Sequence, residues 1–285
     1  MAIKHILLPL NGEPGGAKVA LTALRLAKQF EAHVSAGYED VLGPLYAQAA
    51  GFVPAGPVYG DFFDQMLKLR ADRQALARSQ FDKAVAATHL PIVSAPTCRQ
   101  ASTMWIQDEK SQSLSTHRLV TDLAVMQAPG ASASPATWSL VDTMLFNLRA
   151  PILIVPESCD EINFWRPLIT WNGSGESLRA LKAAVALFPA NAEPVVLTVG
   201  KLSNGRTTAE RAREYLGWHC FSAELRHVDA KASDAAKVIE DEAGRLEAGC
   251  VVMGAYTHSR ARQLLLGGVT DAMLRSAARP VFMCH

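Results

Sequence analysis

The sequence lacks long apolar runs, an excess of charge of one sign and paired cysteines. Its longest apolar runs, such as Pro151–Pro156 and Val195–Val199, have the length of a strand, whereas a membrane helix needs about 20 apolar residues. The 28 Lys and Arg residues against 27 Asp and Glu residues leave a net charge of +1, which argues against a basic nucleic-acid surface. Five cysteines without a C-x-x-C pair indicate reduced thiols and argue against a zinc site. We therefore expect a cytoplasmic protein with no nucleic-acid or membrane partner.

Recognisable catalytic motifs are also missing. The chain has no G-x-x-x-x-G-K-[ST], H-E-x-x-H, G-x-S-x-G or G-x-G-x-x-G motif and no paired carboxylates at a suitable site. We predict neither catalytic residues nor a metal site, and we expect a binding or interaction protein. A hydrolase with an unfamiliar site is the minority alternative.

An internal repeat organises the 285 residues into two copies of domain size. Ile6–Gly12 and Pro167–Gly173 each run from an apolar strand into Asn-Gly, at an offset of 161 residues. Asp142–Ile152 and Asp271–Val281 share an Asp, a Met-Leu pair and a Pro, at an offset of 129 residues. The difference of 32 residues between these offsets predicts an insertion in the first copy, near residues 41–75.

Each copy alternates strand-sized apolar runs with helical patterns, which is typical of a parallel sheet covered on both faces. We predict two tandem, doubly wound, Rossmann-like α/β domains, over residues 1–160 and 161–285. The helices include Asp64–Ala87, one headed by Ser177, one after Thr207-Thr208 and one over Ala232–Glu247. The predicted strands are Ile6–Leu10, Ala32–Gly37, Leu90–Thr97, Leu123–Met126, Pro151–Val155, Leu168–Trp171, Pro194–Val199, Cys220–Val228, Cys250–Gly254 and Pro280–Cys284.

The ligand crevice of an open α/β sheet lies beyond the carboxyl ends of the strands where the winding direction reverses. For this order of elements the reversal falls between the first and fourth strands. In the second copy, Asn172–Ser177 and Gly254–Arg260 leave these two strands. A ligand between the two segments would meet polar side chains and backbone N–H groups.

The segment Val251–Arg260, followed by Leu264–Thr270 and Arg279–Val281, resembles the C-terminal signature of the universal stress protein (UspA) family. With the repeat, the resemblance covers nearly the whole chain and implies a tandem member with the adenine nucleotide alpha hydrolase-like fold. It further implies a role in the stress response and an ATP or AMP site in the second domain, whose glycines let the backbone approach phosphate oxygens. The cofactor-binding residues it implies are Asn172, Val199, Met253, Gly254, Thr257, His258, Gly267, Gly268, Val269 and Thr270.

The glycine pattern of the family is matched in part. Gly254 and Gly267 have the family's spacing, whereas Thr257 stands at the second glycine position and Gly268 at the Ser or Thr position. Gly267-Gly268 is either a phosphate cradle at the start of a helix or a plain turn into that helix. We expect His258 to be an ordinary loop residue, rather than a hydrogen-bond partner of a ligand or a pH-dependent switch.

The aspartate that the family carries after its first strand is replaced by Asn11 and Asn172. Asn-Gly is a strong turn motif after any strand, but its place at the reversal point favours a binding role for Asn172. No matching glycine pair precedes Asp142, so we expect the first copy to have lost the site.

Apolar and aromatic segments suggest packing roles. Trp105 and Trp171 are more typical of core packing than of stacking on a ligand, and Cys250 and Cys284 fall in buried strands. The resemblance implies that the last strand, Pro280–Cys284, pairs with another domain's last strand, either between the two halves of the chain or in a homodimer. The alternative function is an interaction protein that keeps the fold, has lost the nucleotide site and binds a protein partner.

Overall fold

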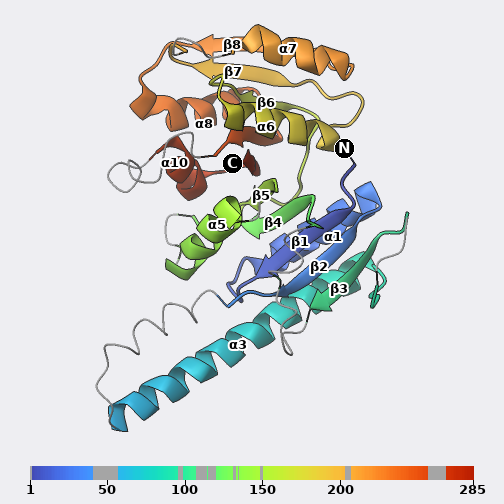
Figure 1. Ribbon diagram of the computed structural model, residues 1–285, viewed down its shortest axis with the longest axis vertical. Coiled ribbons are helices and arrows are strands. Elements are labelled where there is room, and N and C mark those ends of the chain that lie inside the picture. The colour runs from blue at the N-terminus through green and yellow to red at the C-terminus, as the bar shows by residue number, and fades with distance from the viewer. Residues whose placement is uncertain are drawn as a thin grey trace. The chain divides into compact units, whose positions relative to one another are not determined.

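The computed structural model describes residues 2–40, 57–95, 99–106, 114, 120–130, 133, 135–147, 150–202, 207–255 and 268–285. They form two compact units, the N-terminal unit (Lys4–Met126 and Ala133–Thr143) and the C-terminal unit (Met1–Ile3, Gln127–Ser132 and Met144–His285). Both units are built on mostly parallel sheets with helices, which confirms the predicted α/β class (Figure 1). The division of the chain into domains at residue 160 stays a prediction.

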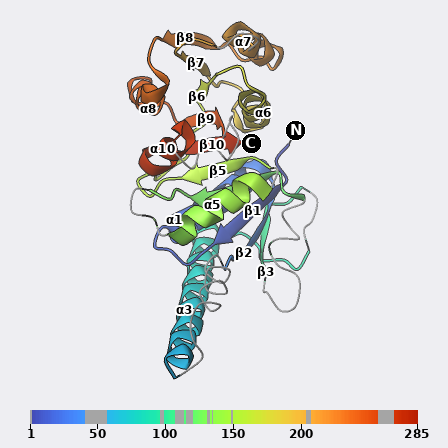
Figure 2. The same cartoon turned by 60° about the vertical axis from the view of Figure 1, so that its left-hand side comes forward.

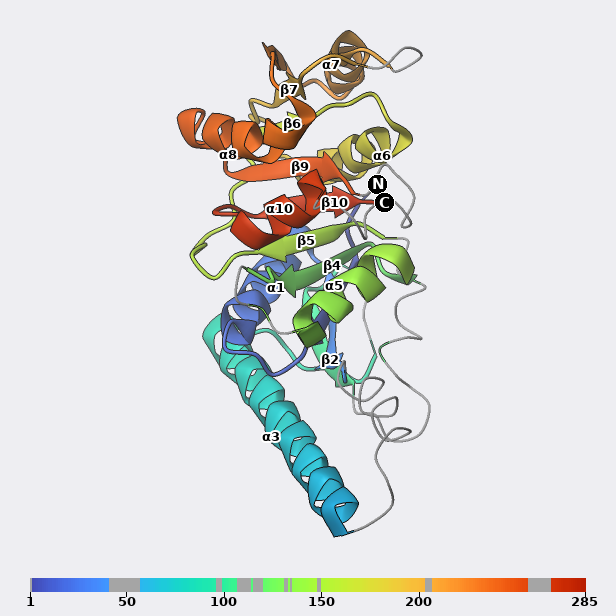
Figure 3. The same cartoon turned by 90° about the vertical axis from the view of Figure 1, so that its left-hand side faces the viewer.

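The N-terminal unit is a parallel sheet in the order β3-β2-β1-β4. The helix predicted over Asp64–Ala87 is confirmed as α3, which is longer at both ends. The C-terminal part of α3 packs on α1 and buries Phe81, while its N-terminal part extends away from the sheet (Figures 1 and 3). The elements are β1 (His5–Leu10), α1 (Gly16–Phe30), β2 (His33–Tyr38), α3 (Pro57–Thr88), β3 (Ser102–Ile106), β4 (Leu123–Gln127) up to Met126, and most of α5 (Pro135–Asn147).

The C-terminal unit has the strand order β5-β10-β9-β6-β7-β8, with every pair parallel except β5 and β10. α6 and α7 cover one face of this sheet, and α8 and α10 cover the other (Figure 2). The elements are β5 (Ile152–Val155), β6 (Pro167–Thr170), α6 (Gly175–Ala184), η2 (Val185–Leu187), β7 (Val195–Val199), α7 (Ala209–Trp218), β8 (Glu224–Val228), η3 (Ala232–Asp234), α8 (Ala235–Arg245), β9 (Cys250–Gly254), α10 (Val269–Ser276) and β10 (Val281–Cys284).

The last strands of the two copies pair with each other. β5 and β10 run antiparallel, with Val281 opposite Ile154 and Phe282 opposite Leu153. All four of these side chains are buried, so the contact is part of the apolar core and not a solvent-exposed edge. The predicted pairing of last strands is therefore confirmed within one chain.

The strand predicted over Leu90–Thr97 is wrong. In the described part of that segment only Ile92 forms a bridge, with Thr103, and the strand beside β2 is β3. The segment is apolar but offers no continuous buried face, since Ile92 is 55% exposed. β3 instead buries Ser102 and Thr103, whose hydroxyls bond to His33 Nδ1 and to the Val34 carbonyl.

Some element boundaries also differ from the prediction. β8 begins at Glu224, because the chain turns through a left-handed residue, Cys220, with φ of 64° after α7. The helix predicted over Ala232–Glu247 is a 3-10 turn followed by α8. α6 begins before Ser177, which lies inside the helix.

Both tryptophans that the sequence assigns to packing do pack. Trp171 is 2% exposed, and its indole N–H donates to the Thr207 carbonyl at 2.8 Å. Trp105 lies 5.2 Å from the Phe81 ring, and the Arg78 guanidinium stands 5.3 Å over the Trp105 ring.

Candidate functional site

The winding direction of the C-terminal unit reverses between β6 and β9. The chain proceeds from β6 outwards to β7 and β8, and then returns to the other side of β6 to form β9 and β10. The predicted reversal between the first and fourth strands is confirmed, and it makes the carboxyl ends of β6 and β9 the candidate crevice.

The turn after β6 has the same geometry as the turn after β1. Asn172 Oδ1 accepts from Ser174 N at 3.1 Å and Gly173 has a φ of 68°. Asn11 Oδ1 accepts from Glu13 N at 3.2 Å and Gly12 has a φ of 71°. In both copies Asn-Gly therefore forms the turn that its composition predicts, because glycine tolerates positive φ and the carboxamide caps the next backbone N–H.

The two asparagines differ in their exposure. Asn172 is exposed, whereas Asn11 is 6% exposed and its Nδ2 donates to Thr137 Oγ1 at 3.3 Å. The asparagine of the same turn is therefore buried in the first copy and exposed in the second.

α3 covers the turn of the N-terminal unit. The Arg73 guanidinium bonds to Glu13 Oε1 at 3.0 Å, and Gln80 Nε2 donates to the Glu13 carbonyl at 2.8 Å. A Cβ atom at Gly12 would collide with the backbone of Arg73. The chain's own helix therefore fills the space beside this turn.

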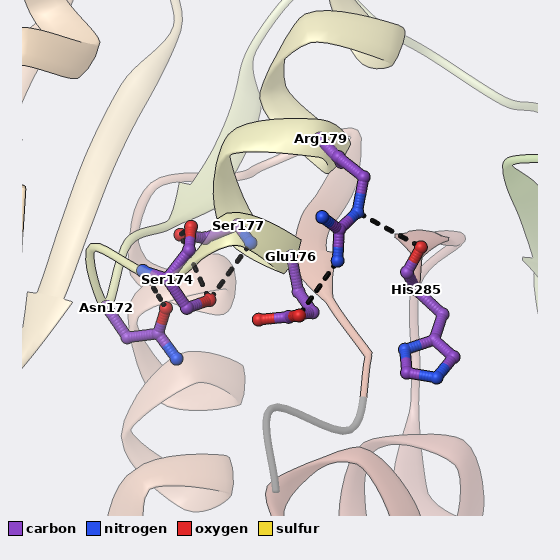
Figure 4. Close-up of polar contacts among 6 residues, drawn as sticks. All are labelled: Asn172, Ser174, Glu176, Ser177, Arg179 and His285. Atoms are coloured by element: carbon purple, nitrogen blue, oxygen red, sulfur yellow. Dashed lines mark hydrogen bonds and ion pairs between the residues drawn. The ribbon is translucent and has the colours of Figure 1, made fainter.

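The start of α6 in the C-terminal unit is capped by Ser174. Its hydroxyl accepts from Ser177 N at 3.2 Å (Figure 4). Its carbonyl accepts from Leu178 N at 3.1 Å. The helix start expected at Ser177 is therefore at Ser174, although Ser174 as a cap residue with Glu176 in the first turn is a recognised signal for a helix start.

Glu176 places a carboxylate at the same helix start. Its Oε1 accepts from Arg179 Nη2 at 2.8 Å, and Arg179 Nε donates to the His285 carbonyl at 3.1 Å (Figure 4). Partial burial alone would raise the pKa of Glu176, but hydrogen bonds from its own backbone N–H and from Ser174, with the charge of Arg179, hold it below its ordinary value. The carboxylate is therefore ionised at neutral pH. The sequence analysis assigned no role to Glu176 or Arg179.

Gly254 brings the end of β9 against α6. A Cβ atom at position 254 would lie 2.6 Å from Ser177 N and 2.8 Å from Glu176 Cβ. Gly254 thus allows α6 to approach β9 closely. This packing is a reason for glycine at position 254 that is separate from the phosphate contact expected from the sequence.

The other predicted binding residues are distributed among the surrounding elements. Met253 is buried in β9, and Val199 is the half-buried last residue of β7, next to β6. Gly268 precedes α10 with a φ of −75° and open space at its Cβ position, so its backbone does not require glycine. Val269 and Thr270 begin α10, and Thr270 is buried. Thr257, His258 and Gly267 lie outside the described residues, as do Arg260 and Arg262.

The described ranges contain neither a metal-binding cluster nor a helix able to span a membrane. No group of three or more His, Cys, Asp or Glu side chains there is arranged to hold a metal ion. None of the helices in that part of the chain is both long and apolar enough to cross a membrane.

Comparisons with solved structures show the fold. The chain is similar to a universal stress protein from Archaeoglobus fulgidus, with 15% sequence identity, a TM-score of 0.62, and coverage of 98% of this chain and 95% of that chain. A putative universal stress protein from Pseudomonas aeruginosa has 15% identity and a TM-score of 0.48, over 99% of this chain and 93% of that one. A universal stress protein solved in complex with cAMP has 21% identity and a TM-score of 0.34, over 42% of this chain and 96% of that chain.

The sequence itself matches a family over its C-terminal part. A search among curated proteins found no match. Residues 221–285 match the universal stress protein family, and this segment contains β8, α8, β9, α10 and β10. The match therefore assigns the C-terminal segment, residues 221–285, to the universal stress protein family.

Proposed function

We propose that the protein is a non-enzymatic stress-response module of the cytoplasm, whose C-terminal unit binds ATP or AMP in the crevice beyond β6 and β9. The observation that carries this proposal is the exposure of Asn172 at the reversal point, in contrast to the burial of Asn11 in the equivalent turn. An exposed carboxamide can exchange hydrogen bonds with a base or a ribose. The match of residues 221–285 to the universal stress protein family supports the same crevice.

The N-terminal unit has a different role in this proposal. Because Arg73 and Gln80 of α3 contact the turn at Glu13, a ligand at this turn would have to displace the helix. We assign this unit a structural or partner-binding role, without a nucleotide.

The alternative is an interaction protein without a nucleotide. It is supported by the apolar side chains that the N-terminal half of α3 exposes, such as Leu67 at 48% and Leu69 at 36%. Under this alternative the crevice is a remnant and a protein partner contacts α3.

Calorimetric titration of the full chain with ATP and with AMP, each with and without magnesium, tests the proposal. We expect one site per chain with a Kd of about 1–100 μM, or about −8 to −5.5 kcal/mol. Asn172→Ala should weaken binding about tenfold, since it removes the exposed carboxamide. Asn11→Ala is the matched control, because it changes the equivalent turn in the covered copy and should leave the affinity unchanged.

The negative outcome is equally informative. If millimolar nucleotide gives neither heat nor thermal stabilisation, the nucleotide proposal fails and the interaction alternative stands.

A further inference from the structure

The ionised carboxylate of Glu176 lies at the edge of the proposed nucleotide crevice. The position is fixed by the close approach of β9, since the ideal Cβ of Gly254 would be 2.8 Å from Glu176 Cβ. The Glu176 side chain is only 20% exposed, so solvent screens its charge less than that of a surface carboxylate.

Two hydrogen-bond donors at the start of α6 are already in use. Ser177 N donates to Ser174 Oγ and Leu178 N donates to the Ser174 carbonyl. The Ser174 hydroxyl donates to Ser177 Oγ at 3.5 Å. The Glu176 carboxylate stands at the same helix start, and its hydrogen-bonding surroundings lower its pKa. A helix start normally attracts an anion, but here an intramolecular anion holds that place.

Arg179, the neighbouring cation, does little to offset the repulsion between Glu176 and an incoming phosphate. Arg179 Nη2 bonds to Glu176 at 2.8 Å, and its Nε donates to the His285 carbonyl at 3.1 Å. Within the described residues, this guanidinium is the cation bonded at the start of α6, and a phosphate would have to compete with Glu176 for it.

We propose that Glu176 is a specificity-determining residue, which makes the C-terminal site select adenosine or AMP over ATP. This inference rests on the proposed function. Repulsion between the carboxylate and the phosphates grows with the number of phosphates, so it weakens ATP more than AMP and leaves adenosine unaffected.

Glu210 provides a matched control for the helix start. It stands two residues after the cap Thr208 of α7, as Glu176 stands two residues after Ser174 of α6. Hydrogen bonds from Thr208 and from its own backbone N–H likewise lower the pKa of Glu210. α7 begins beside the same turn, since Thr207 N donates to the Gly173 carbonyl at 3.4 Å, but Glu210 is exposed and solvent screens its charge. Glu210→Gln therefore controls for the loss of a screened carboxylate at a helix start.

The test measures the Kd of the full chain for adenosine, AMP and ATP, in the wild type, Glu176→Gln, Glu176→Ser and Glu210→Gln. Wild type should bind adenosine and AMP more tightly than ATP. The ratio of the ATP Kd to the adenosine Kd should fall about tenfold in both Glu176 variants and should not change in Glu210→Gln. Thermal denaturation checks that each variant is folded, and the two Glu176 variants provide independent readouts.

The other outcomes would overturn either the selection inference alone or the proposed function with it. If wild type binds adenosine but the ratio is the same in the folded Glu176 variants, or changes equally in Glu210→Gln, the selection inference fails and the nucleotide site stands. If wild type binds none of the three compounds, the proposed function fails and the inference fails with it.

Discussion

Gly254 lies so close to Ser177 that a Cβ atom at position 254 would be 2.6 Å from the Ser177 backbone nitrogen. The contact joins the end of β9 to the first turn of α6. It holds together the two segments that border the candidate crevice. A side chain at position 254 would therefore disturb the packing of α6 on β9.

Gly254→Ala should destabilise the C-terminal unit by about 1–3 kcal/mol, because the added methyl group must push α6 away from β9. Gly268→Ala is the control, since none of the described residues lies within 4 Å of its ideal Cβ and its φ is −75°. Chemical denaturation of both variants measures the difference. Equal stability of the two variants would contradict the packing role of Gly254.

Ser174→Ala should lower the free energy of unfolding by about 1 kcal/mol, because Ser177 N loses its cap acceptor. Thr208→Ala alters the equivalent position of α7, where the side chain makes no cap hydrogen bond, and should cost less than about 0.5 kcal/mol. Urea unfolding curves distinguish the two variants. A loss in Thr208→Ala as large as that in Ser174→Ala would refute the assignment of the cap.

The ion pair between Glu13 and Arg73 should contribute to the attachment of α3. The two side chains are each 21% exposed and their charged atoms are 3.0 Å apart. A double-mutant cycle with Glu13→Gln and Arg73→Met should give a coupling of about 1 kcal/mol. The exposed pair Arg211–Glu214 on α7 serves for comparison, with an expected coupling below about 0.5 kcal/mol. The interpretation is wrong if the Glu13–Arg73 cycle shows no coupling.

The pH dependence of stability should carry a contribution from Glu240. Burial raises the pKa of Glu240 above its ordinary value of 4.5, and Arg279, at 3.9 Å, offsets this only in part. The folded state therefore holds this proton more tightly than the unfolded state, so Glu240 costs stability as the pH rises from below 4.5 through its folded pKa. Glu240→Gln removes this cost.

Denaturation of wild type and Glu240→Gln at a series of pH values measures the effect. The variant should lose less stability than wild type between acidic and neutral pH. Glu176→Gln should behave in the opposite sense, since the lowered pKa of Glu176 gives stability that is present above 4.5 and is lost as the pH falls through its folded pKa. Parallel profiles of wild type and Glu240→Gln would count against the prediction.

The buried thiols should resist alkylation in the native protein. Burial raises the pKa of Cys284 to about 12 and raises that of Cys250 as well, so neither forms the reactive thiolate near pH 8. Cys220 is exposed and is the internal reference. Mass spectrometry after iodoacetamide treatment should find Cys220 modified well before the other two. Equal rates at all three positions would disprove the burial of Cys250 and Cys284.

The sequence by itself determined the repeated strands and the Asn-Gly turns. These features depend on local patterns, since an apolar strand followed by Asn-Gly specifies a turn with positive φ whatever surrounds it, as Gly12 and Gly173 show. The position of the reversal point followed from the order of the elements alone.

Only the tertiary structure decided which copy keeps an open turn and which segment forms β3. Asn11 and Asn172 have the same local sequence, but α3, which begins 46 residues after Asn11, brings Arg73 and Gln80 to the first turn. Leu90–Thr97 is the more apolar candidate for a strand, yet β2 pairs with Ser102–Ile106 instead. Both results depend on contacts with segments distant in the sequence, α3 for the first turn and β2 for the choice of strand, and a local pattern carries no information about those contacts.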